Sequence, residues 1–343
     1  MKAEIRKYWF VILYLLLALG ALCIHPLSGD EIVSFPWKTA SYLFMLILLE
    51  EGLKREKIAL PFFRVLNSVR STPFMFFLLL SSTFLLSLFF FPFIVVSIMV
   101  PFTVKLLEES RKEKYTSVSV ALITLLSVIT TLFTPFSEAD LYLFLESGVS
   151  YSSYMKELLP PFFASLAVFT AEAFIVLRKT RGDEIYLHIE NEDYWEKERR
   201  GMRILYASFF LVVLFGRRFN TVDLLIVVAA AFLILDRKIY REIDWGVLAA
   251  LLLFMLSGYT LGKTSPGENR MLGGLISVVF TRLGGLAAGS GVTATLPSLI
   301  ISFSIPLLYA VRETEREKKE TVKKYALLSL PHALVYVLFF LFF

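Results

Sequence analysis

Apolar runs long enough to cross a bilayer recur along this chain, and they constrain its fold more than any other feature. Hydrophobic residues make up 57% of the 343 residues, and the mean hydropathy is +0.68. Soluble domains carry less apolar sequence, in shorter runs. Segments inside hydrocarbon must satisfy their backbone hydrogen bonds internally, which helices do. The sequence therefore predicts an all-α polytopic membrane protein.

Charge and cysteine content narrow the partners of the chain. The net charge is +5, but the basic residues stand in short loops beside apolar runs, where they act as topology signals rather than nucleic-acid contacts. The single cysteine, Cys23, lies in the first apolar run and supports neither a disulfide framework nor a thiolate metal cluster. We expect the lipid bilayer as a partner, no nucleic acid, no metal site, and no cofactor beyond a coupling ion, Na⁺ or H⁺.

The distribution of Lys and Arg predicts the topology. Lys2, Arg6 and Lys7 place the N-terminus in the cytoplasm. The apolar run that follows has a small-residue motif inside it rather than after it, so we expect a retained helix and not a cleaved signal peptide. We expect a multi-pass protein of the inner (plasma) membrane, with four parts: an N-terminal transmembrane helix (1–26), a first repeat with a hairpin and a broken helix (27–178), a polar cytoplasmic linker (179–202), and a second, inverted repeat with a C-terminal helix (203–343).

Apolar length sets the expected helices, roughly nine crossings in all. The helices are expected at about 36–49, 116–133, 161–177, from 203, from 221, 245–262, 293–310 and 325–343. The stretch 73–107, interrupted at Pro92 and Pro101, has basic loops on both sides, so it either crosses twice or turns back inside the membrane. In the second half, 263–290 is expected to form a re-entrant hairpin that enters from the outside.

Two stretches of the sequence resemble each other and look like an internal repeat. Helices led by Trp37 and Trp245 are each followed by a Pro-interrupted segment rich in small and hydroxyl residues, at 130–140 and 289–298. A helix break frees backbone N–H and C=O groups. In a membrane such breaks are tolerated only where these groups line a cavity or find other hydrogen-bond partners. Either break alone is more simply a proline kink packed against a neighbour. Two breaks in corresponding places favour a binding site near the midplane.

These stretches carry a resemblance to a known family. The runs 37–52, 86–101 and 133–142, followed by Ser147-Gly148 and Leu159-Pro160, resemble the N-terminal half of a citrate-transporter-like permease, and 243–245 with 289–300 resembles its second half. That group belongs to the ion transporter superfamily, with divalent anion symporters, arsenite permeases and a class of sodium/proton antiporters. The resemblance implies an inverted-repeat transporter with two re-entrant hairpins and two broken helices that meet at a central substrate and cation site. It also suggests a homodimer.

The resemblance also implies site residues, with departures. Counting forward from Ser87, Pro92 occupies the position where the family has a hairpin-tip Asn, and Asn269 is the best candidate for the second tip. The broken helix keeps Thr134-Pro135 but replaces the Gly-Asn-Pro-x-Asn run that follows it in the family. The lost amide leaves open whether Na⁺ or H⁺ is the coupling ion. The predicted substrate and ion site comprises Ser87, Thr134, Pro135, Ser137, Asp140, Asn269, Arg282, Ser290, Gly291, Thr293, Thr295 and Ser298.

Two ionisable residues fall within apolar sequence. Arg282 could bind a carboxylate or oxyanion bidentately, or it could extend to the interface instead. Glu172 is the candidate proton carrier, and its alternative role is as a structural partner for Arg282 or a hydroxyl. We therefore expect a secondary active transporter of a carboxylate or another small anion, coupled to H⁺ or Na⁺.

Two other functions stay open. The run 50–55 fits the EExxxR element of intramembrane glutamyl proteases, but those enzymes also need membrane histidines, and His25, His188 and His332 lack the expected context. A charged helix end is the better account of this run, so we expect no enzyme. A degenerate, non-transporting membrane subunit is favoured by Pro92 at the hairpin tip, whereas the retained broken helices argue against it.

Overall fold

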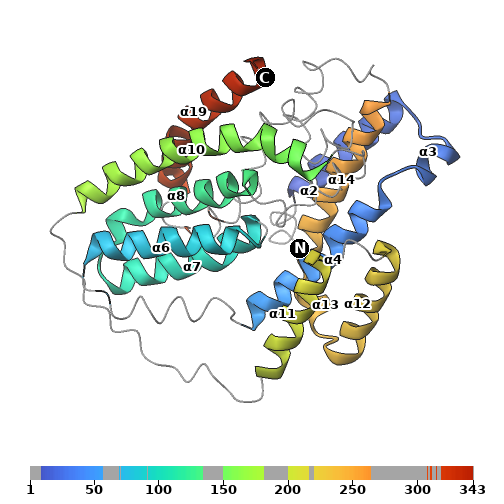
Figure 1. The fold of residues 1–343 in the computed structure, drawn as a ribbon, viewed down its shortest axis with the longest axis horizontal. Coiled ribbons are helices and arrows are strands. Elements are labelled where there is room, and N and C mark those ends of the chain that lie inside the picture. The colour runs from blue at the N-terminus through green and yellow to red at the C-terminus, as the bar shows by residue number, and fades with distance from the viewer. Residues whose placement is uncertain are drawn as a thin grey trace.

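The computed structural model describes residues 9–56, 69, 71–90, 92–133, 150–180, 200–215, 220–263, 307, 310, 314 and 318–342. Every element in these ranges is a helix (Figure 1). The elements are α2 (Trp9–Ile24), α3 (Gly29–Val33), α4 (Trp37–Arg55), α6 (Thr72–Ser87), α7 (Pro92–Glu109), η1 (Glu113–Tyr115), α8 (Thr116–Ile129), η2 (Thr130–Leu132), α10 (Tyr151–Lys179), α11 (Arg200–Phe215), α12 (Thr221–Leu235), α13 (Ile239–Glu242), α14 (Trp245–Gly262) and α19 (Lys318–Phe342).

Most of the expected helices are present, and three have different bounds. The helix expected at 36–49 continues to Arg55. The helix expected at 116–133 is confirmed by α8 and η2. The helix expected to begin at Pro161 was placed wrongly, because α10 begins at Tyr151 and carries Pro160 and Pro161 inside it. The side chain of Ser150 caps α10 by accepting from a backbone N–H, so the helix starts there and continues through the prolines. The last helix likewise begins at Lys318, ahead of its expected start at Tyr325.

The surface of these helices is apolar. Four of the described helical segments are long and apolar enough to cross a membrane: Gly29–Arg55, Ser152–Lys179, Trp245–Gly262 and Lys318–Phe342. Large hydrophobic side chains point outward along several helices, including Leu16, Phe174, Ile234 and Leu334. Apolar exposure on this scale is what a lipid-facing surface requires, and water does not favour it.

The helices form two bundles (Figure 1). The hairpin bundle contains α6, α7, α8, α10 and α19, and the tryptophan bundle contains α2, α4 and α11 to α14. Each has a central helix that is covered on all sides: α8 in the first, and residues 45–53 of α4 in the second. The bundles do not follow chain order, since α4 packs with later helices and α19 packs with earlier ones.

The two Trp-led helices begin with the same local structure. The indole N–H of Trp37 donates to the carbonyl of Ile32 at 2.9 Å, and that of Trp245 donates to the carbonyl of Tyr240 at 2.9 Å. Both tryptophans therefore bond to the residue five positions earlier. Each backbone N–H also bonds to the carbonyl two residues before it, at 2.6 and 3.0 Å, and a short helix, α3 or α13, precedes each tryptophan.

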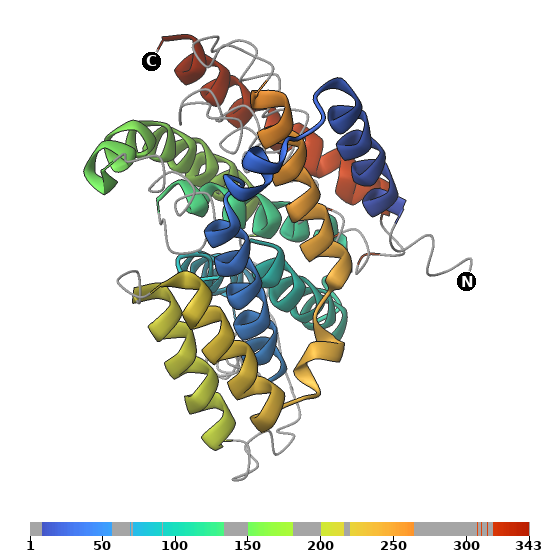
Figure 2. The same cartoon turned by 90° about the vertical axis from the view of Figure 1, so that its right-hand side faces the viewer.

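These two helices run antiparallel, as Figure 2 shows. The Tyr259 hydroxyl, near the end of α14, donates to the Glu31 carbonyl at 3.0 Å and lies 2.7 Å from the Ser34 hydroxyl, just before α4. At the opposite end, Arg55 of α4 forms an ion pair with Glu242, just before α14. The similar Trp-led starts therefore point in opposite directions.

A close contact joins α4 to α11 and generates a stability prediction. A methyl group at Gly52 would overlap the ring of Tyr206. That ring cannot yield easily, because it stacks on Phe232 at 4.5 Å and its hydroxyl donates to Asp236 at 2.8 Å. We expect Gly52→Ala to cost about 1–3 kcal/mol through overpacking, measured as a lower melting temperature in detergent.

The matched control is Gly20→Ala in α2, where nothing lies within 4 Å of the added carbon. This change improves helix propensity and should be neutral or stabilising. Equal melting temperatures for the two variants would show that the Tyr206 ring does not restrict the space at Gly52.

Candidate functional site

The central helix α8 carries many buried hydroxyl groups, but they are satisfied within the helix. Thr124 donates to the Val120 carbonyl at 2.8 Å, and Thr130 donates to the Leu126 carbonyl at 2.7 Å. Ser119 and Ser127 bond in the same manner to their own helix or the turn before it. Such local bonds leave little capacity for a ligand. The hydroxyls of Ser119, Thr124, Ser127 and Thr130 are therefore structural.

Helix α19 reverses the usual pattern of an amphipathic helix. Its buried residues are all polar, whereas leucines such as Leu327, Leu330 and Leu334 face outward. The polar positions recur every three or four residues and so form one stripe, directed at α8 and α10. The stripe consists of Thr321, Tyr325, Ser329, His332 and Tyr336. An inward polar stripe on a helix with an apolar exterior indicates a buried polar site.

A histidine–glutamate pair lies at the centre of this site. His332 Nε2 is 3.3 Å from Glu172 Oε2, which joins α19 to α10. The imidazole is fully buried and the Glu172 side chain is 13% exposed. Within the described residues, His332 Nδ1 has no hydrogen-bond partner. Each group can hold or release a proton, so the pair is chemically able to exchange one.

Sequence reasoning identified Glu172 but not its partner. The expected partners were Arg282 or a hydroxyl, and the structure provides His332 instead. His332 was judged only against protease motifs. Its place in the polar stripe, three residues after Ser329 and four before Tyr336, is the signal that would have revealed it.

The predicted hairpin is present in the first half. Helices α6 and α7 pack side by side, and the chain turns at residues 88–90. Ser87 is fully buried, and its hydroxyl makes no hydrogen bond to any described residue. Pro92 is the first residue of α7, where its missing N–H costs nothing. Phe90 at the tip stacks on Phe210 of α11 at 5.2 Å, so the tip contacts the tryptophan bundle.

Other buried hydroxyls of the hairpin bundle, like that of Ser87, have no hydrogen-bond partner among the described residues. Thr103 on α7, Ser165 on α10 and Thr321 on α19 are fully buried, and their oxygens have no hydrogen-bond partner among the residues described. Native proteins pair nearly all such groups, with protein or with bound water or ions. The hairpin bundle thus holds unused polar capacity where a ligand or water could bind.

Of the predicted site residues, the structure places Ser87 and Glu172, both in the hairpin bundle. The remaining predicted site residues lie outside the described residues. These are Thr134, Pro135, Ser137, Asp140, Asn269, Arg282, Ser290, Gly291, Thr293, Thr295 and Ser298. Within the described ranges, no group of three His, Cys, Asp or Glu side chains could hold a metal ion.

The protease-like run 50–55 belongs to a charged network at the end of α4. Arg55 forms ion pairs with Asp236 and Glu242, and its Nε also lies 3.3 Å from Glu56. The two histidines in the described part have other partners: His25 bonds to Glu31 before the start of α4, and His332 bonds to Glu172. This network ties α4 to α12 and α13.

No protein-family model matches the sequence, and no curated protein matches it. Functional inference therefore rests on the geometry of the site and on the sequence resemblance described above.

The Arg55 network gives a second stability prediction. Arg55→Gln leaves Asp236, only 10% exposed, without its cation. The pair is partly buried, so its loss should cost more than the roughly 0–1 kcal/mol of a surface pair and less than the about 3–5 kcal/mol of a fully buried one, and we expect a clear fall in the melting temperature. Lys105→Gln is the control, because Lys105 pairs with Glu109 at 3.8 Å on an exposed surface and should contribute less than about 1 kcal/mol. Similar effects of the two changes would show that the network contributes no more than a surface pair.

The buried pair is tested by a double-mutant cycle of Glu172→Ala and His332→Ala. Interhelical hydrogen bonds in membranes are worth about 0.6–1.7 kcal/mol, and we expect a coupling free energy of that size in unfolding measurements. Ser329→Ala combined with His332→Ala is the control pair. Because the Ser329 hydroxyl donates to the Ala326 carbonyl of its own helix, its removal should be additive. Additive effects of the Glu172 and His332 changes would rule out an energetic link.

Proposed function

We propose that this protein is a secondary active transporter that moves a carboxylate or another small anion across the inner membrane and couples this movement to protons. The observation that carries the proposal is the contact between Glu172 and His332, inside a bundle whose outer surface is apolar. Ionisable groups within a membrane are costly, and where they are kept they mark proton or substrate pathways. The chain is then a polytopic membrane protein with its N-terminus in the cytoplasm.

Protons are favoured over sodium by two observations. Pro92 occupies the hairpin position where the related permeases have an amide ligand, and it begins helix α7. A proline there offers no side-chain oxygen for a cation. The His332–Glu172 pair, in contrast, consists of the two side-chain types that proton relays use most.

The arrangement of the helices supports alternating access. The antiparallel Trp-led helices α4 and α14 are what an inverted repeat requires. The hairpin bundle holds the candidate site, and its tip meets the tryptophan bundle at an aromatic contact between Phe90 and Phe210. Movement of one bundle against the other would expose the site to each side in turn. In this proposal Arg282, Thr134 and Asn269 contact the anion.

A non-transporting subunit is the second candidate, because Pro92 removes the expected hairpin ligand. The two functions differ in one measurable respect. A transporter binds its substrate in the folded state and is stabilised by it through mass action. A thermal-stability screen of the purified protein against sodium, pH, di- and tricarboxylates, arsenite and sulfate therefore separates them. A specific, saturable shift supports transport, whereas no shift from any ligand supports the subunit.

The coupling role of Glu172 is tested in proteoliposomes with the anion found by that screen. Glu172→Gln keeps the size and hydrogen-bonding capacity of the side chain but cannot release a proton. We expect it to lose uptake driven by a pH gradient, on the order of a hundredfold, while substrate exchange at equal pH and the substrate-induced thermal shift persist. Lys105→Gln, on the exposed surface of α7, should leave all three unchanged.

Two results would contradict this assignment. Uptake of the Glu172→Gln variant that still follows the pH gradient would exclude Glu172 as the proton carrier. Uptake that follows only a sodium gradient in the unmodified protein would replace protons with sodium. The anion site is tested separately, since Asn269→Ala, Thr134→Ala and Arg282→Ala should each abolish uptake without loss of folded protein.

A further inference from the structure

Polar side chains follow the inward face of α19 from its first turns to the His332–Glu172 pair. Thr321, Tyr325, Ser329 and His332 are all buried, and they recur at intervals of four, four and three residues. Because a helix rises by about 1.5 Å per residue, neighbouring positions lie about 4.5–6 Å apart along its axis. A single water that bonds to two groups spans about 5.5 Å. The stripe therefore has the spacing that single waters can bridge.

Buried polar atoms with incomplete hydrogen bonding lie at both ends of this segment. Thr321 Oγ1 and His332 Nδ1 have no hydrogen-bond partner among the described residues, and both side chains are fully buried. The buried Thr124 and Thr130, in contrast, donate to carbonyls of their own helix. Native proteins bond nearly all such groups to protein or to ordered water. We therefore expect ordered water at both ends of the segment.

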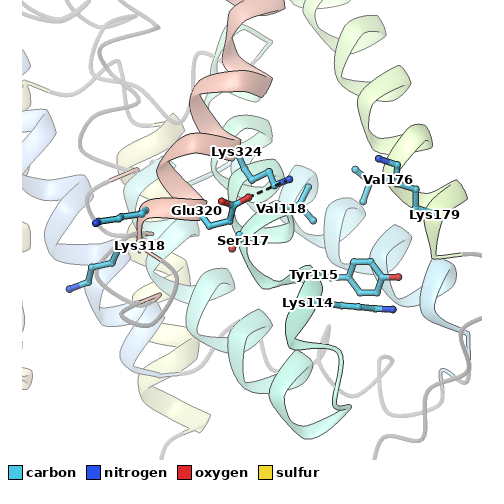
Figure 3. Close-up of a pocket in the computed structure, with 10 residues that line it drawn as sticks. Lys114, Tyr115, Ser117, Val118, Val176, Lys179, Lys318, Glu320 and Lys324 are labelled. Carbon is cyan, nitrogen blue, oxygen red and sulfur yellow. Dashed lines mark ion pairs between the residues drawn. The ribbon is translucent and has the colours of Figure 1, made fainter.

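The first turn of α19 borders a cavity that is open to water (Figure 3). The cavity measures about 830 Å³, and Lys319 and Glu320 are among the residues that line it. The Glu320 side chain is 49% exposed, whereas the next residue, Thr321, is fully buried. Thr321 thus lies where the interior of the bundle meets the solvent. The topology proposed above places this end of α19 in the cytoplasm.

The groups at the inner end of the stripe can receive a proton. A neutral imidazole has one donor and one acceptor nitrogen, and His332 Nε2 lies 3.3 Å from Glu172 Oε2. When Nδ1 accepts a proton from water and Nε2 releases its own proton to the Glu172 carboxylate, one proton is transferred and the imidazole stays neutral. Helix α8, which also packs against α19, has no ionisable residue in Thr116–Ile129 and so offers no competing acceptor.

We propose that Thr321, Tyr325 and Ser329 hold a chain of ordered waters that conducts protons from the cavity to His332 and Glu172. A hydroxyl oxygen accepts hydrogen bonds as well as donating one, so each of the three side chains can bind water on this face. The chain of waters is the entry path for the coupling protons, and in this role it rests on the transport function proposed above.

The test measures how fast the His332 imidazole proton exchanges with water, by NMR of the purified full-length protein with isotope-labelled histidine. The signal is assigned by its loss in His332→Ala. Thr321→Val keeps the shape of the side chain but removes the hydroxyl, and we expect it to slow the exchange roughly tenfold, because the relay loses one hydrogen bond. Thr321→Ser retains the hydroxyl and should exchange at the rate of the unmodified protein.

The matched control is Thr170→Val, which removes a hydroxyl from the exposed face of α10. The Thr170 hydroxyl donates to the Leu166 carbonyl of its own helix at 2.7 Å, so the exchange rate should not change. Three outcomes would overturn the path: unchanged exchange in Thr321→Val, equal slowing in Thr170→Val, or slow exchange in Thr321→Ser. If Thr321→Val does not fold, Tyr325→Phe removes another hydroxyl of the stripe, and unchanged exchange in that variant has the same meaning.

The exchange measurement needs no substrate, so it separates the path from transport. Exchange that depends on the Thr321 hydroxyl, in a protein that no ligand stabilises, supports the path and contradicts the transport function. Uptake driven by a pH gradient, in a protein whose exchange does not depend on that hydroxyl, supports transport and overturns the path.

Discussion

A polar group inside an apolar-surfaced bundle must find a partner there, and this constraint organises the structure. The hydroxyls of α8 meet it by bonding to their own helix. Helix α19 meets it by turning its polar stripe inward and its leucines outward. His332 and Glu172, from helices far apart in the sequence, meet it by contacting each other. Leaving either group alone in the interior would cost several kcal/mol, so the pair also fixes how α10 and α19 pack.

The basic residues at the helix ends both predict the topology and form contacts between helices. Lys and Arg at helix ends predict the orientation of the chain, and in the structure some of these residues also form ion pairs between helices. Arg55 forms ion pairs with Asp236 and Glu242 at one end of the tryptophan bundle. In the hairpin bundle, Lys114, Lys179 and Lys318 are among the residues that line one cavity.

The sequence predicts local structure well and long-range partners poorly, for physical reasons. Apolar length and the Trp37 and Trp245 positions locate α8, α14 and the start of α4 almost to the residue, because these signals are local, whereas α4 continues six residues past its expected end at Leu49. The start of α10 was missed because the Ser150 cap outweighs two prolines. Glu172 was identified from the cost of burying a charge, but nothing local indicates His332 as its partner, since only the packing of α10 on α19 brings them together.

Buried polar atoms without a hydrogen-bond partner among the described residues occur in both bundles, for example Glu56 Oε2 in the tryptophan bundle, but more of them lie in the hairpin bundle, and this difference bears on the proposed mechanism. In the tryptophan bundle, Tyr259 fastens one end of α14 to the start of α4, and Arg55 fastens the other end. In the hairpin bundle, Ser87 and His332 Nδ1 are among several buried groups that have no hydrogen-bond partner within the described residues. A frame bonded at both ends resists rearrangement, whereas unused polar capacity needs water, an ion or a substrate to complete it. In the proposed transport mechanism, the tryptophan bundle is therefore the fixed frame, and the hairpin bundle is the part that binds and moves.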